Sequence, residues 1–283
     1  MKLTQPYCEI KVHSKPIILF RSDIDMENEL SIASKHITTV DSRVLIPDNS
    51  SVIARYSVLP WYQELERDLA HRSSKLLNSY REHKFIADLL EWGGPYGVLK
   101  GLTPQSWSNW SRLPDNMSFV VKGRVNSRKQ NWATQMFAET KTDVSRVAAG
   151  LLGDSLIGDQ GIIVREYVPL KQLDIGLNGL PIANEWRTFW VKNQAGEIHQ
   201  LCKGYYWRAS HPDSEADAAY SDEAEKVVRK AAEIVSEYCT FFVLDVAETA
   251  AGDWIIVEVN DAQMSGLCGC SAEELYGNLA RVI

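Results

Sequence analysis

The sequence has 283 residues, of which 45% are hydrophobic and 24% are charged. These proportions are typical of folded globular proteins, so they exclude an intrinsically disordered chain and a collagen-like one. The length is large for one hydrophobic core, which favours a two-lobed domain or two domains in contact. The formal net charge of −7 argues against general nucleic-acid binding.

No apolar segment approaches the roughly 18 residues that a membrane helix needs. Residues 1–10 lack the basic and then apolar pattern of a signal peptide. We therefore expect a cytoplasmic protein without membrane segments. The five cysteines are odd in number and scattered, which indicates reduced thiols, and Cys268 and Cys270 lack the second pair that a zinc site usually needs.

The first part of the chain has the pattern of a small α/β domain. Short apolar segments bounded by polar residues predict strands at residues 17–20, 37–40 and 51–58. From residue 61 to residue 92 the apolar residues follow a helical spacing, and Gly93-Gly94-Pro95 ends it. We predict an N-terminal α/β domain over residues 1–95.

The rest of the chain, residues 96–283, is richer in strand patterns. Strands are predicted at residues 118–121, 161–168, 186–191, 198–206, 240–246 and 254–259. Helices are predicted at residues 141–157, 215–238 and 272–283. So many strands with only three helices predict an α+β fold with a largely antiparallel sheet.

Acidic side chains lie inside two apolar strands near the end of the chain. A symmetric turn centred between Ala251 and Gly252 places Asp245 directly opposite Glu258. Asn260 shares the face of Glu258 because the two are two residues apart. Directly opposed like charges destabilise a sheet, so a cation is expected between them, and three hard oxygen ligands suit Mg²⁺ together with phosphate oxygens. A solvated polar face is the alternative.

Basic residues follow or lie on other predicted strands. Lys122 ends a buried strand, and a basic loop with Arg128 and Lys129 follows it. Such cations suit a polyphosphate, although an isolated lysine at a strand end is often only solvated. Glu185 and Arg187 share a face of another strand, where a simple cross-strand ion pair is the alternative.

In their order and spacing these residues resemble the ATP-grasp superfamily, and especially its short, poorly characterised members. The residues that carry the resemblance are Lys122, Arg165-Glu166-Tyr167-Val168, Glu185-x-Arg187, Lys203, Asp245 and Glu258-x-Asn260. The resemblance covers residues 96–283. It implies two lobes with mainly antiparallel sheets that clasp ATP, preceded by the small α/β domain.

The resemblance also implies a role for each of these positions. The backbone of Glu166, Tyr167 and Val168 would hold the adenine, and Glu185 the ribose. The phosphates would be bound by Lys122, Arg187 and Lys203, of which Arg187 and Lys203 are the candidate catalytic residues. One or two Mg²⁺ ions would be held by Asp245, Glu258 and Asn260.

Two features depart from the superfamily pattern. The glycine-rich loop that usually follows the strand lysine is replaced by Asn126-Ser-Arg128-Lys129. Arg128 and Lys129 are therefore weaker candidates for contact with an anionic acceptor. The second ATP-binding lysine is either Lys84 or Lys100, and the sequence leaves this open.

The implied reaction is ligation of a carboxylate to an amine through an acyl phosphate, with release of ADP and phosphate. A kinase that phosphorylates a small molecule or protein is one alternative, and a catalytically silent nucleotide-binding module is another. Two opposed carboxylates are costly to keep in a silent site, which favours an enzyme. Arg21, Arg43 and Arg55 are candidates to receive an anionic substrate. The sequence does not identify the carboxylate or the amine, and it does not decide whether they are small molecules or peptides. It also leaves the oligomeric state open.

Overall fold

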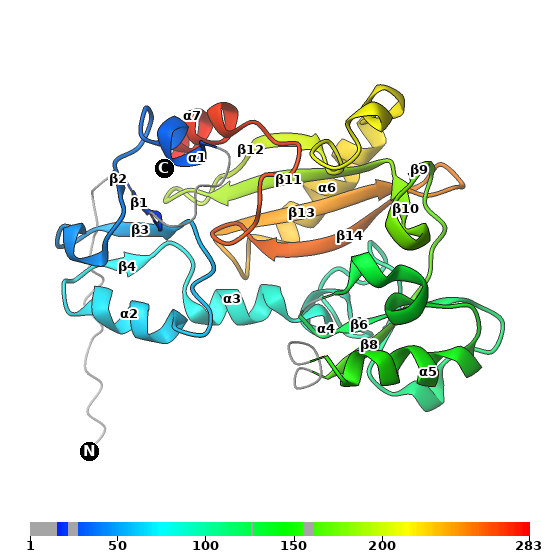
Figure 1. Cartoon of the computed structure of the whole chain (residues 1–283). Helices are drawn as coiled ribbons and strands as arrows, with labels where there is room; N and C mark the ends of the chain where they lie inside the picture. The colour runs from blue at the N-terminus through cyan, green and yellow to red at the C-terminus, as the bar shows by residue number, and fades with distance from the viewer. Residues whose placement is uncertain (1–15, 22–27, 126, 155–160) are drawn as a thin grey trace, which may run out of the picture.

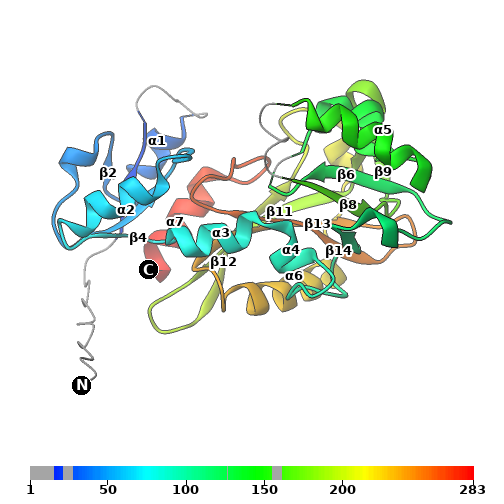
Figure 2. The same ribbon diagram turned by 90° about the horizontal axis from the view of Figure 1, so that it is seen from below.

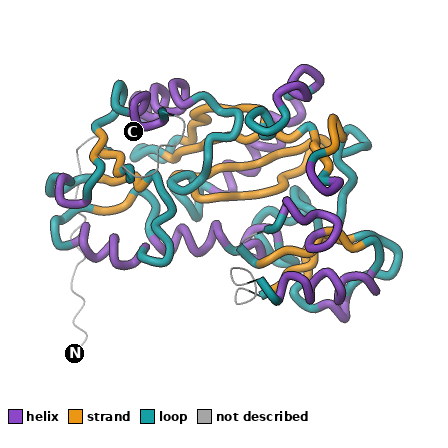
Figure 3. Tube along the Cα trace, viewed as in Figure 1, coloured by secondary structure: helices purple, strands orange, loops and turns teal. Residues whose placement is uncertain are grey.

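The structure is a computed structural model that describes residues 16–21, 28–125, 127–154 and 161–283 (Figure 1). Two sheets face each other in it, and a third lies at one end. We call the four strands β12-β11-β13-β14 the central sheet and the unit formed by β5-β8-β6-β7 and α5 the small lobe. We call the unit around the sheet β2-β1-β3-β4 the N-terminal lobe. Helices cover these sheets on their outer sides (Figure 3).

The N-terminal lobe is a small α/β unit, as its sequence pattern predicts. Its strands are β1 (Ile17–Leu19), β2 (Thr39–Val40), β3 (Ser51–Ala54) and β4 (Lys75–Leu76). All neighbouring pairs in this sheet are parallel. Helix α2 (Tyr62–Ala70) packs on the sheet through its apolar face, and α1 (Glu29–Ala33) packs against α7 near the end of the chain.

The continuous helix predicted over residues 61–92 is wrong. The chain leaves α2 after Ala70 and forms β4, then enters α3 (Tyr80–Ala87) and α4 (Leu89–Gly93). Ser79 and Glu82 form a capping box that starts α3, and Asp88 caps α4. Such polar residues compete with continuous helix formation because their side chains bind free backbone N–H groups.

The small lobe presents one face of its sheet to a helix and the other to the central sheet. Its elements are β5 (Ser106–Trp107), β6 (Phe119–Gly123), β7 (Phe137–Ala138), α5 (Lys141–Leu152) and β8 (Ile162–Glu166). Phe119, Val121 and Val164 pack with α5. Alternation along the strands therefore turns Lys122 and Arg165 toward the central sheet. Helix α5 ends at Leu152, and residues 155–157 of the predicted helix lie outside the described residues.

The central sheet is antiparallel throughout, which agrees with the predicted α+β fold. Its strands are β11 (Glu185–Lys192), β12 (Ile198–Tyr205), β13 (Phe241–Glu248) and β14 (Trp254–Asp261). Helix α6 (Asp222–Val235) covers one face, and the small lobe lies over the other (Figure 2). Helix α7 (Ala272–Val282) and the N-terminal lobe cover the remaining end of that second face.

Two details of this region differ from the sequence prediction. The helix predicted over residues 215–238 begins only after Ser221, whose side chain caps α6, and a short turn of 3₁₀-helix (Pro212–Asp217) precedes it. The hairpin of β9 (Gln172–Ile175) and β10 (Pro181–Ala183) was not expected. Its strands are short, and β9 is mostly exposed whereas β10 is mostly buried, so neither carries a clear apolar alternation.

The hairpin of β13 and β14 places Asp245 opposite Glu258, as predicted. Nearer the turn, however, Val246 lies opposite Ile256. Val257 is thus the extra residue of a β-bulge, which shifts the register by one position. The bulge turns Glu258, instead of its neighbour, to the face that the small lobe covers.

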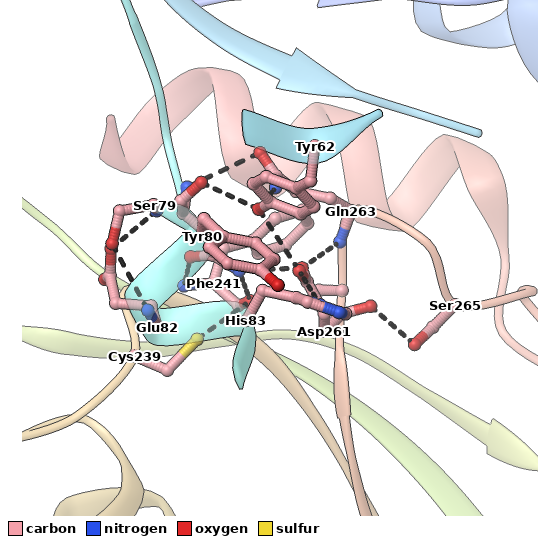
Figure 4. Close-up of polar contacts among 12 residues, drawn as sticks. Tyr62, Ser79, Tyr80, Glu82, His83, Cys239, Phe241, Asp261, Gln263 and Ser265 are labelled. Carbon is pink, nitrogen blue, oxygen red and sulfur yellow. Dashed lines mark hydrogen bonds and ion pairs between the residues drawn. The ribbon is translucent and has the colours of Figure 1, made fainter. Parts of the chain in front are cut away.

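A buried polar network joins the N-terminal lobe to the end of β14 (Figure 4). Asn78 Nδ2 donates to the Phe241 carbonyl at 2.6 Å and to Asp261 Oδ1 at 2.7 Å. Gln263 Nε2 donates to the hydroxyl of Tyr62 at 2.7 Å. We call this network the joint. Its hydrogen bonds fix the N-terminal lobe against the strand that carries Glu258 and Asn260.

Arg55 strengthens the joint from the side of the N-terminal lobe. Its guanidinium is buried, forms an ion pair with Glu29 at 2.6 Å, and donates to the carbonyls of Ala262 and Ser265 at 2.6 and 2.8 Å. The expectation that Arg55 receives an anionic substrate is therefore wrong, because its donors are already used inside the protein.

Among the helices of the described residues, none has the length and apolar character to cross a membrane.

Candidate active site

Two neighbouring cavities lie between the small lobe and the central sheet. The first has a volume of about 130 Å³, and its walls include Trp132, Met136 and the segment from Glu166 to Val168. The second has a volume of about 500 Å³ and is lined by Arg187 and Asn260, among others. The cavities share Ser127, Lys129 and Glu258 in their linings. Together they have the size of an ordinary ligand site, which is roughly 300–1,000 Å³.

The side chain of Asp245 is bound by an arginine of the neighbouring strand. Arg187 lies directly opposite Asp245, and its Nε and Nη2 donate to the two carboxylate oxygens at 2.8 and 2.7 Å. Asp245 is fully buried. Burial opposes the charge of Arg187, but the carboxylate of Asp245 outweighs it and raises the pKa of Arg187 well above its usual value. Nη1 of Arg187 also donates to the Gly266 carbonyl at 2.8 Å, so the guanidinium is held in one orientation.

The side chain of Glu258 is bound by a lysine of the other lobe. Lys122 Nζ lies 3.1 Å from Glu258 Oε1, and both side chains are largely buried. Burial by itself raises the pKa of Glu258, but Lys122, Lys129 and Arg187 lower it well below its usual value. This ion pair therefore bridges the two lobes directly beside the shared lining of the cavities.

Lys129 lies at the centre of the site, although its sequence signal was weak. Its Nζ donates to the hydroxyl of Tyr206 at 3.1 Å and lies 4.5 Å from the centre of that ring. Burial opposes its charge, but Tyr206, Glu185 and Glu258 are among the groups that raise its pKa well above the usual value. Arg128, in contrast, binds Asp154 through Nε and Nη2 at 2.6 and 2.7 Å while it lines the second cavity.

Three buried polar atoms that border the first cavity have no hydrogen-bond partner in the described residues. They are Arg165 Nε, Glu185 Oε1 and Trp207 Nε1. Burial is the main cause that raises the pKa of Glu185 to about 7. The positive charge of Lys129 opposes this rise, and the negative charge of Asp245 adds to it. Buried polar groups are nearly always paired in folded proteins, so unpaired ones at a cavity indicate where a ligand would bind.

Lys203 does not face the cavities, so this part of the predicted site is wrong. It pairs with Thr188, whereas Arg187 pairs with Gly204 on the same strand. Alternation then directs Lys203 to the face covered by α6, where its ammonium lies 4.1 Å from the centre of the Tyr220 ring. Gly204 itself touches Gly269: a Cβ at position 204 would lie 2.1 Å from the Gly269 carbonyl carbon.

The other lysines and arginines considered from the sequence also lie elsewhere. Neither Lys84 nor Lys100 lines either cavity, and Lys84 borders a separate groove beside α3. Arg43 is bound to Glu64 and Asp68 on the surface. Of the basic residues that the structure describes, Lys129 is the one that lines both cavities, and Lys122 lines the first cavity with it.

The three predicted metal ligands lie on one face of the central sheet. Asp245 and Glu258 are opposed, and Asn260 lies opposite Val243 on the same face and lines the second cavity. No group of three or more His, Cys, Asp or Glu side chains suited to a metal ion occurs among the described residues. The candidate set is thus two carboxylates and one amide.

Comparison with known protein families and solved structures identifies the fold. Residues 109–279 match the family described as ATP-grasp domain, R2K clade family 3. No curated protein sequence matches the chain. Among solved structures, D-cycloserine synthetase DcsG is similar with a TM-score of 0.60 at 12% identity, over 94% of this chain and 98% of that one.

Two further structures show the same similarity. N5-carboxyaminoimidazole synthase from Aspergillus clavatus, in complex with ADP and 5-aminoimidazole ribonucleotide, has a TM-score of 0.56 at 12% identity, over 95% of this chain and 76% of that one. The ATP-grasp ligase PsnB, with a precursor peptide and AMPPNP, has a TM-score of 0.54 at 11% identity, over 94% and 96%. At such identities the similarity shows the shared fold. Since the family match covers more than half of the sequence, this chain belongs to the ATP-grasp domains of R2K clade family 3.

Proposed function

We propose that this protein is an ATP-dependent ligase that joins a carboxylate to an amine. The observation that carries the proposal is the junction of the two cavities, where Lys122 and Lys129 lie beside Glu258, which is paired across the hairpin with the buried Asp245. An apolar cavity next to concentrated charge suits a nucleotide base followed by its phosphates. We further propose that residues 96–283 form the ATP-grasp domain and residues 1–95 the domain that precedes it.

The first cavity is the proposed adenosine site. Glu166, Tyr167 and Val168 line it together with Trp132 and Met136. Glu185 borders the same cavity with one unpaired carboxylate oxygen, which is an acceptor for a ribose hydroxyl. The phosphates would then extend to the junction, within reach of Lys122, Lys129 and Arg187.

The donor set at the junction fits Mg²⁺. Asp245, Glu258 and Asn260 offer hard oxygen atoms from one face of the sheet, which is the ligand type that Mg²⁺ prefers beside phosphate oxygens. In the structure these carboxylates are neutralised by Arg187 and Lys122. When bound, Mg²⁺ would supply charge neutralisation at the transferred phosphoryl group. Arg187 and Lys122 would then bind the phosphates instead of the carboxylates.

The proposed reaction needs no nucleophilic side chain. The carboxylate substrate attacks the γ-phosphorus, an O–P bond forms, and the bond from that phosphorus to the β-phosphate oxygen breaks to release ADP. The amine then attacks the acyl carbon, loses a proton, and phosphate leaves. Arg187 and Lys129 neutralise charge at the phosphates, and the cover of the small lobe keeps water from the acyl phosphate.

A trapping experiment tests this function. The purified protein is incubated with ATP, Mg²⁺ and pools of carboxylic acids and peptides, with hydroxylamine in place of the amine. A ligase should form a hydroxamate and ADP, and Lys122→Met should lose both products. AMP as the product would contradict the proposal, and a stable phosphorylated acceptor without phosphate release would establish a kinase instead.

A further inference from the structure

Arg165 is a buried arginine whose role neither the fold nor the proposed chemistry explains. It lies on β8 directly opposite Val120, and therefore on the same face of the small lobe as Lys122. Its exposed fraction is 6%. No salt bridge is found for it within the described part of the chain, and its guanidinium lies 5.5 Å from the centre of the Trp92 ring. A buried guanidinium without an ion pair is costly, so an apolar side chain would be the more stable choice here.

The guanidinium crosses from the small lobe to the bulge in β14. Nη1 donates to the Val257 carbonyl at 2.5 Å, and Nη2 lies 3.5 Å from the Ile256 carbonyl. Burial lowers the pKa of Arg165 to about 10, although Glu258 and Glu166 oppose this effect. The two carbonyls belong to the bulged residue and the one before it, and Glu258 follows immediately.

These contacts matter because the bulge decides which way Glu258 points. If Val257 instead paired regularly with Asp245, the alternation of β14 would shift by one residue and Glu258 would leave the face that it shares with Asp245. Lys122 binds the carboxylate itself, but only Arg165 among the described small-lobe residues is seen to donate to the backbone of the bulge.

We propose that Arg165 is a positioning residue for Glu258, acting through the backbone of Ile256 and Val257. The strand that leads into the adenine-binding segment from Glu166 to Val168 would thereby also fix the carboxylate at the phosphate end of the nucleotide. This inference rests on the proposed nucleotide site. It concerns how the site is held together and adds no new chemical step.

The experiment compares nucleotide binding with and without metal in wild type and Arg165→Met. Calorimetric titration with AMPPNP is done in EDTA and in saturating Mg²⁺, so that no turnover is needed. We expect Arg165→Met to bind AMPPNP in EDTA with nearly the wild-type affinity. The gain in affinity from Mg²⁺ should fall by about tenfold or more, as for other residues that orient metal ligands. Arg165→Lys, which keeps one donor group, should retain part of the gain.

Arg124→Met is the matched control, because Arg124 binds Asp88 at the lobe boundary and does not line either cavity. It should keep the full gain from Mg²⁺. Thermal unfolding checks that each variant is folded, and Arg165→Lys provides the same comparison if Arg165→Met does not fold.

Three results would overturn the inference. An undiminished gain from Mg²⁺ in Arg165→Met would show that Glu258 needs no such support. An equal loss of affinity in EDTA and in Mg²⁺ would show that the unpaired Nε of Arg165 contacts the nucleotide directly. A wild-type protein that binds no AMPPNP in either condition would refute the proposed function, and this inference with it.

Discussion

Strand β14 takes part in two buried polar networks that differ in what they leave unpaired. Around Asp261, in the joint, none of the buried side-chain nitrogen or oxygen atoms of the described residues lacks a partner. Around Glu258, three residues earlier, Arg165 and Glu185 keep unpaired atoms at a cavity. Buried charge is common to both networks, so it does not by itself identify a site. Unpaired atoms beside a cavity do distinguish the second network from the first.

The largest effect is expected from breaking the joint. Arg55→Met leaves Glu29 buried without its ion pair, which should lower the free energy of unfolding by about 3–5 kcal/mol. Urea denaturation measures this change. The exposed Arg43, which binds Glu64 and Asp68, is the control, and Arg43→Met should cost less than about 1 kcal/mol. Equal effects of the two changes would mean that the joint is not a structural network.

At the network around Glu258, the larger effect is expected on turnover and the smaller one on stability. Glu258→Gln keeps the shape of the side chain but removes the charge beside Lys122, so turnover should fall by about a hundredfold or more. Stability should fall less than in Arg55→Met, because the amide oxygen of the glutamine can still accept a hydrogen bond from Lys122 and both side chains border the first cavity. Steady-state release of ADP and urea denaturation measure the two quantities. Normal turnover at saturating Mg²⁺ would remove Glu258 from the site.

Two lysines test the assignment of the faces of the central sheet. Lys129→Met should weaken ATP binding by about 1.5–3 kcal/mol, the usual contribution of a hydrogen bond to a charged group. Lys203→Met, on the face covered by α6, should leave ATP affinity unchanged. Calorimetric titration compares the two variants. A loss of affinity in Lys203→Met alone would restore the sequence prediction.

The smallest effect concerns Glu185 and depends on pH. Its pKa is raised from 4.5 to about 7 in the folded protein, so the folded state binds more protons than the unfolded state between these values. The wild type should lose stability as the pH rises from about 4.5 to about 7. Glu185→Gln removes the buried charge and should be more stable than the wild type at pH 8 but not at pH 4.

Thermal unfolding across this pH range measures the difference. The exposed Glu139 offers a control, and Glu139→Gln should follow the wild type at every pH. If the stability of Glu185→Gln depended on pH in the same way as that of the wild type, Glu185 would be ionised in the folded protein. Its second oxygen would then be paired to solvent or to Lys129.

The sequence predicted the carboxylate pair because a hairpin is a local structure. A symmetric turn gives the correct partner for Asp245, but it would also pair Val246 with Val257, and the structure pairs Val246 with Ile256. The bulge that causes this difference depends on contacts with Arg165, which lies far away in sequence. Counting residue pairs outward from the turn along the two strands gives no information about such a long-range contact.

The basic residues were harder to assign for the same reason. Lys122 and Arg187 each line one of the cavities, because each belongs to a strand whose inward face is apparent from its apolar neighbours, and their contacts with the phosphates stay a prediction. Lys203 was chosen from the order of the motifs alone, and order does not determine which face of β12 it occupies. Lys129 follows β6 in a loop without periodicity, so its central position depends on the packing of the lobes.

The opposed acids of the β13–β14 hairpin also affect how the chain folds. Arg187 is 58 residues from Asp245, and Lys122 is 136 residues from Glu258, so the charges that neutralise this hairpin come from distant parts of the chain. A hairpin normally forms early because its contacts are local, but these two carboxylates repel each other until the distant cations arrive. During synthesis both cations leave the ribosome before the acids do. The hairpin is therefore expected to be stable only when it adds to strands that are already in place, as one of the last steps of folding.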